Sequence, residues 1–145
     1  MTGRIVQINV SPGGVPKLPV PRVRVTALGL EGDGHRSEHH GGAERALCLF
    51  ALERLEALRA EGHPVVPGGL GENLTVAGLD WAAVGPGDRF RLGDGVVIEV
   101  TRFTNPCLYL TNLDQLGRDR VRFVALPLRL DGAEGAPARA IALLD

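Results

Sequence analysis

The alternation of apolar and polar side chains predicts a chain built mainly from short strands. Strands are predicted at residues 4–10, 22–28, 73–76, 88–92 and 96–101, and residues 121–130 are compatible with another. The turn-forming Ser11-Pro12-Gly13-Gly14 sequence ends the first strand. Gly93-Asp94-Gly95 joins the fourth and fifth strands and is a strong hairpin signal.

One segment has helical periodicity instead. Residues 51–61 place leucines at positions 52, 55 and 58 on one face and charged side chains on the other, and Gly62 is a natural stop. Pro16, Pro19 and Pro21 are expected to keep their stretch extended and outside any regular ladder. The predicted fold is mainly β, a β-barrel with one or two short helices, closed or nearly closed so that no long strand edge is exposed.

The composition narrows the function classes. A chain of 145 residues predicts a single domain over residues 1–145. A net charge of −1 and an aromatic content of 4% argue against a nucleic-acid partner. No apolar run is long enough to span a membrane and no signal-peptide pattern is present, so a cytoplasmic protein without a membrane partner is expected. The two cysteines do not suggest a disulfide framework.

Cys107 is the leading candidate for chemistry. It ends a Thr-Asn-Pro-Cys sequence in which Pro106 restrains the backbone on both sides. A thiol presented in this way can act as a metal ligand, a nucleophile or a sulfur carrier, because the thiolate is the reactive form. The alternative is a small buried hydrophobic residue. Cys48, with leucines on both sides, is predicted to be a packed residue of that kind.

Residues 32–45 form a second candidate site, rich in glycine, histidine, acidic side chains and arginine. Glycine allows close backbone approach to a ligand, and arginine provides paired donors for phosphate. The pattern suits a phosphorylated or very polar small molecule. Two alternatives remain: a solvated loop with no ligand, or a zinc site made by His35, His39 and His40.

Two shorter motifs accompany these. Residues 68–74 place Glu72 and Asn73 after a glycine-rich stretch, which indicates either an ordinary turn or a turn that positions two polar side chains. Arg102 precedes Cys107 by five positions and would favour its thiolate form.

Taken in order, these motifs resemble the MOSC domain, the C-terminal module of molybdenum-cofactor sulfurases that also occurs as a small bacterial protein. The resemblance covers about residues 1–107, and residues 108–145 depart from the family pattern. The matching stretches are Ser11 to Lys17, Gly29 to Asp33, His39 to Gly42 with Arg45 and Ala46, Gly71 to Leu74, Pro86 to Asp88, and Pro106-Cys107.

The resemblance implies a β-barrel that binds the molybdenum cofactor, a pterin. It makes Cys107 a molybdenum ligand or a persulfide carrier, in reduction of N-hydroxylated compounds or in cofactor sulfuration. A cysteine desulfurase or an electron-donor protein is then an expected partner, and a non-catalytic binding or storage module is the alternative. The implied cofactor-binding residues are His39, His40, Gly41, Gly42, Arg45, Glu72, Asn73 and Arg102.

Overall fold

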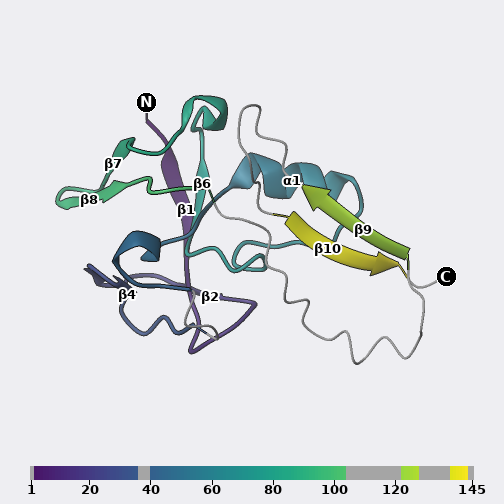
Figure 1. Ribbon diagram of the computed structural model, residues 1–145, viewed down its shortest axis with the longest axis horizontal. Helices are drawn as coiled ribbons and strands as arrows, with labels where there is room; N and C mark the ends of the chain where they lie inside the picture. The colour runs from purple at the N-terminus through teal and green to yellow at the C-terminus, as the bar shows by residue number, and fades with distance from the viewer. Residues whose placement is uncertain (1, 36–39, 104–121, 128–137, 144–145) are drawn as a thin grey trace.

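The computed structural model describes residues 2–35, 40–103, 122–127 and 138–143, the last two ranges as paired strands. Among the described residues, the regular secondary structure is mainly β strand, with one α-helix (Figure 1). The strands are β1 (Arg4–Val10), β2 (Leu18–Val20), β3 (Val25–Thr26), β4 (Gly29–Leu30), β5 (Leu49–Ala51), β6 (Leu74–Ala77), β7 (Arg89–Leu92), β8 (Val96–Glu99), β9 (Arg122–Pro127) and β10 (Ala138–Leu143). The helical elements are α1 (Leu52–Ala60) and the short 3₁₀ turns η1 (Ala43–Arg45) and η2 (Trp81–Ala83).

The central sheet has the strand order β2-β1-β6-β5. Strand β1 is antiparallel to both of its neighbours, and β6 runs parallel to β5. The pairing of β1 with β6 shifts register between Ile5 and Gln7. The shift falls at Val6, the apolar residue that interrupts the alternation of apolar and polar side chains in β1. Parallel strands need a long crossover connection between them. For β5 and β6 this connection consists of α1, which follows β5 directly, and the loop that leads from α1 back to β6.

The helix packs through the leucines that its periodicity predicts. Leu55 and Leu58 are buried and form a core cluster with Phe50 of β5 and Val65 of the following loop. The helix ends at Ala60, and Gly62, the predicted stop, follows with φ of 93° and an N–H that donates to the Arg59 carbonyl at 3.0 Å. Burial of each such leucine is worth about 1.5–3 kcal/mol, so this cluster anchors α1 beside the sheet.

Four predicted strands are confirmed with shifts of a few residues: β1, β6, β7 and β8. The strand expected at 22–28 is confirmed only at Val25–Thr26, because Thr26 turns the chain back on itself: its hydroxyl donates to the Gly29 carbonyl at 2.9 Å. The expectation that prolines keep residues 16–21 outside any ladder is wrong. Pro19 lies opposite Asn9 in β2, and the edge position of that strand tolerates a residue without an N–H.

The mainly β prediction is confirmed, but a closed barrel is not. Among the described residues, the strands pair as the central sheet and three separate two-stranded ladders, β3-β4, β7-β8 and β9-β10. Figure 1 shows the β7-β8 hairpin and α1 on opposite sides of β1 and β6. The barrel stays a prediction.

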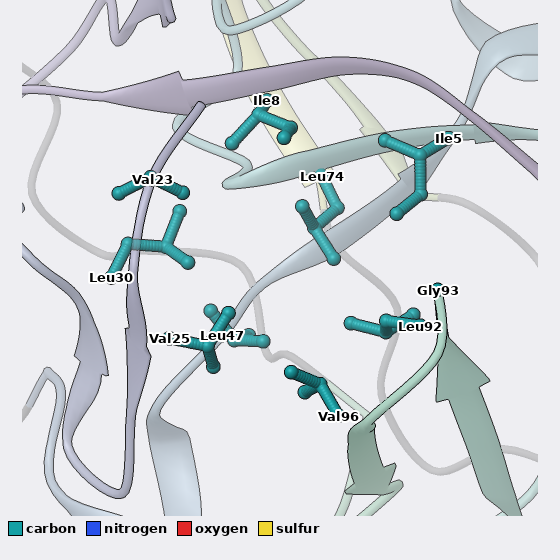
Figure 2. A pocket seen from close by; sticks show the side chains of 10 residues that line it. All are labelled: Ile5, Ile8, Val23, Val25, Leu30, Leu47, Leu74, Leu92, Gly93 and Val96. Atoms are coloured by element: carbon teal, nitrogen blue, oxygen red, sulfur yellow. The ribbon is translucent and has the colours of Figure 1, made fainter. Parts of the chain in front are cut away.

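An apolar cavity of about 210 Å³ lies between β1, β6 and the two hairpins β3-β4 and β7-β8. Figure 2 shows aliphatic side chains from all of these elements pointing toward a common space. They are Ile5, Ile8, Val23, Val25, Leu30, Leu47, Leu74, Leu92 and Val96, with Gly93 at the hairpin turn. These side chains therefore line a partly open apolar hollow that the described residues do not fill.

Candidate functional site

A buried carboxylate, Asp33, joins three of the sequence motifs. Its Oδ1 accepts the Ser11 N–H at 3.0 Å. Its Oδ2 forms an ion pair with Lys17 Nζ and accepts Asn73 Nδ2 at 2.8 Å. The side chains of Asp33 and Lys17 are only 1% and 8% exposed. The turn after β1, the loop after β4 and the start of β6 thus meet at one charged centre, which we call the Asp33 hub (Ser11, Lys17, Asp33 and Asn73).

The hub sets the charge state of Asp33. Burial alone would raise the pKa of this carboxyl, but the hydrogen bonds from Lys17, Asn73 and the Ser11 N–H, together with the charge of Lys17, lower the pKa below its usual value. Asp33 is therefore an anion near neutral pH. A buried ion pair of this kind is costly to break from one side, because the remaining charge stays buried without a partner.

Glu72 fixes the glycine-rich turn that precedes β6. Its Oε1 accepts the Gly68 N–H at 2.6 Å and the Thr75 hydroxyl at 3.0 Å, and its Oε2 accepts the Leu70 N–H at 3.3 Å. Gly68 has φ of 81°, and a Cβ on it would lie 2.2 Å from the Lys17 carbonyl oxygen. Only glycine allows this approach, which docks the turn against the backbone of Lys17, just before β2.

Asn73 connects the hub to β1 and β5. Besides Asp33, its Nδ2 donates to the Asn9 carbonyl at 3.3 Å, and its Oδ1 accepts the Cys48 N–H at 3.1 Å. Glu72 and Asn73 are 1% and 3% exposed. The hydrogen bonds that the structure gives these two predicted site residues run to the protein itself, so both residues fix the turn before β6 and the start of that strand. Their predicted support of a cofactor stays a prediction.

Lys17 and Asp33 were not among the predicted site residues. The signal was available, since Lys17 is the chain's single lysine and lies in an otherwise apolar, proline-rich stretch. A lone lysine among prolines does not disclose its partner, however, because Asp33 is sixteen positions away. Asn9 is 0% exposed and donates to the Thr75 hydroxyl at 3.3 Å. The alternation of the first strand indicates only a polar position there.

The predicted ligand-binding segment is described from His40 onward. His40, Gly42 and Arg45 are exposed, and Gly41 is half-buried. The Arg45 N–H donates to the Gly42 carbonyl at 3.0 Å and closes the η1 turn. A Cβ on Gly42 would meet no atom within 4 Å. His40 and Arg45 are thus exposed and the Gly42 backbone has open space beside it, so this segment offers donor types that suit a phosphate-bearing ligand.

A hydrogen bond connects this segment to the chain that leads to Cys107. The Thr101 hydroxyl donates to the Glu44 carbonyl at 2.7 Å, across fifty-seven positions of sequence. Arg102 follows Thr101 and is exposed. Cys107 and His39 lie outside the described residues, so their predicted proximity stays a prediction.

The structure leaves the zinc alternative untested. His35 and His40 are described, whereas His39 is not. Within residues 2–35 and 40–103, no three histidine, cysteine or acidic side chains gather closely enough to hold a metal ion. Cys48 is half-buried at the start of β5, which agrees in part with its predicted packed role. In the part of the chain that the structure describes, no helix is long and apolar enough to span a bilayer.

Comparison with known proteins gives the family. The MOSC domain model matches residues 36–131. This chain belongs to the MOSC domain family. The matched range extends past residue 107, where the motif resemblance ends. Of the Asp33 hub, it includes Asn73 and leaves out Ser11, Lys17 and Asp33.

Two curated relatives match part of this MOSC chain. A protein named reductase from Gibberella moniliformis is 36% identical over 91 residues, 60% of this chain and 16% of the relative. The uncharacterized protein YflK of Bacillus subtilis is 36% identical over 100 residues, 67% of this chain and 45% of the relative. The chain thus spans less than half the length of either relative. No solved structure matches significantly.

Proposed function

We propose that this MOSC protein binds the molybdenum cofactor in one site formed by residues 39–45 and the Cys107 segment. The observation that carries the proposal is the hydrogen bond from Thr101 to the Glu44 carbonyl. It holds the beginning of the Cys107 segment against η1, and six residues span at most about 20 Å. The connection is therefore long enough to let Cys107 reach the His40 and Arg45 side chains.

Each part of the proposed site has a separate task. His39, His40, Arg45 and the backbone of Gly41 and Gly42 bind the pterin and its phosphate, since Arg45 offers charged donors and Gly42 leaves open space. Cys107 supplies a soft thiolate to molybdenum, and Arg102 favours that thiolate. Glu72 and Asn73 support the site through the turn and strand that they fix. A strand from the C-terminal third that completes a barrel would cover the apolar cavity.

The bound cofactor would supply a metal centre for two-electron chemistry. The relative named reductase favours a reductase activity. By the family resemblance the substrate is an N-hydroxylated compound, whose N–O bond would be cleaved with two electrons and two protons to release water. The electrons come from a donor protein, since the chain has no flavin, haem or iron–sulfur motif. The second activity is cofactor sulfuration, in which Cys107 receives a sulfur atom as a persulfide from a cysteine desulfurase. Both activities use the same thiol, so one set of variants tests the site.

The test is elemental analysis of protein purified from a host that makes the cofactor. Wild type and Cys48→Ser should carry molybdenum, whereas Cys107→Ser should carry neither molybdenum nor cyanide-labile sulfur while keeping its circular dichroism spectrum. Serine cannot replace thiolate as a soft ligand. Full molybdenum content in Cys107→Ser would refute the ligand role. Zinc in wild type at one equivalent would favour the histidine site, and a loaded protein without either activity would favour a storage module.

A further inference from the structure

The backbone from Gly41 to Ala46 is held from two sides by close contacts. A Cβ placed on Gly41 would lie 2.8–3.2 Å from three ring atoms of His35, so the imidazole rests directly against the Gly41 backbone. A Cβ placed on Gly29 would lie 2.7 Å from the Ala46 carbonyl oxygen, so the β3-β4 turn meets the other end of the segment. The η1 turn lies between these two contacts.

His35 is well placed to hold the segment because the backbone just before it, at Gly34, is fixed against the turn of the Asp33 hub. The Gly34 N–H donates to the Ser11 carbonyl at 2.6 Å, and a Cβ on Gly34 would lie 2.1 Å from the Pro12 carbonyl oxygen. His35 Nε2 is 3.9 Å from Asp33 Oδ2, beyond a direct hydrogen bond. The side chain of His35 is 27% exposed. Its contact with Gly41 is therefore a packing contact between the ring and the backbone.

We propose that His35 is a positioning residue: its ring packs under Gly41 and holds the His40–Arg45 turn in the arrangement that presents Arg45 to an anionic ligand. The identity of that ligand rests on the proposed function. The packing role does not, because it follows from the contact between the ring and the backbone. Hydrogen bonding and metal ligation by the imidazole are the competing roles.

The first experiment uses the protein without cofactor. Trypsin cleavage of the Arg45–Ala46 bond, followed by mass spectrometry, reports how well the turn is held. His35→Ala should speed this cleavage about tenfold, the effect of losing about 1.4 kcal/mol of local stability. His35→Phe keeps a ring and should cleave at the wild-type rate. His63→Ala is the matched control, since His63 is 23% exposed and also lies near a carboxylate, and it should leave the rate unchanged.

The second experiment compares two glycines with nearly equal φ angles. Gly41 and Gly42 have φ of 78° and 81°, in the region that favours glycine, but only the Gly41 position meets the His35 ring. Part of the Gly41→Ala effect should therefore depend on His35, so this substitution should accelerate cleavage less in a His35→Ala background than in wild type. The effect of Gly42→Ala should be the same in both backgrounds.

The outcomes separate the roles. Fast cleavage in both His35→Ala and His35→Phe would overturn the packing role, and so would a Gly41→Ala effect of the same size in the wild-type and His35→Ala backgrounds. Binding of isolated molybdenum cofactor, followed by pterin fluorescence, should be weakened by His35→Ala and restored by His35→Phe. If no variant binds the cofactor while the cleavage pattern holds, the proposed function fails and the positioning role stands.

Discussion

Asp33→Asn is the most informative single substitution, because it removes one charge from a buried pair. The asparagine oxygen can still accept the Ser11 N–H, but its amide nitrogen would face two donors, Lys17 Nζ and Asn73 Nδ2. Lys17, 8% exposed, would keep its charge without an anion. Removing one partner of a buried pair costs about 3–5 kcal/mol. That is a large part of the roughly 5–15 kcal/mol that typically stabilises a domain.

The assay is urea denaturation followed by circular dichroism and by the fluorescence of the single tryptophan, Trp81. Lys17→Met should destabilise by a similar amount, because it leaves the carboxylate buried. The double variant should lose less than the sum of the two, by about 0.5–3 kcal/mol, since no unpaired charge remains. Simple additivity, or a loss below about 1 kcal/mol in Asp33→Asn, would refute the argument that this pair organises the three motifs.

The effect should depend on pH in one direction. Since the pKa of Asp33 is lowered in the folded protein, its stabilisation is complete above the unfolded value near 3.8 and is lost as pH falls through the folded pKa. The stability difference between wild type and Asp33→Asn should therefore be largest near neutral pH and shrink below about pH 3.8. A difference that grows in acid would contradict the sign of the shift.

Three further outcomes are expected. Arg45→Ala should weaken cofactor binding by about 1.5–3 kcal/mol, the range for a hydrogen bond to a charged group, and an unchanged affinity by titration would make the segment scaffolding. Val25→Ile should raise the free energy of unfolding by about 0.8 kcal/mol, because it adds a methylene to the open apolar cavity, whereas Val97→Ile at an exposed position of β8 should not. Alkylation of the native protein should label Cys107 faster than Cys48, and the reverse order, read by mass spectrometry, would reject Cys107 as the functional thiol.

Much of the local structure could be predicted from the sequence. The alternation of apolar and polar side chains predicted β1. The leucine spacing predicted α1, and Gly62 predicted where the helix stops. Pro19 was misread because a proline excludes a central strand but not an edge strand. Which strand becomes an edge depends on the partners that it finds, and alternation within one segment carries no information about that.

The candidate site divides in the same way. The sequence alone determined which residue types could do chemistry, namely a thiol after a proline and a segment of glycine, histidine and arginine, because these motifs are contiguous. The tertiary structure decided that Glu72 and Asn73 fix the turn before β6 and the start of that strand, that Asp33 pairs with Lys17, and that Thr101 meets Glu44. These contacts join residues up to fifty-seven positions apart. Which residues become partners depends on the path of the folded chain and on the cost of burying an unpaired polar group. A local sequence pattern contains information about neither.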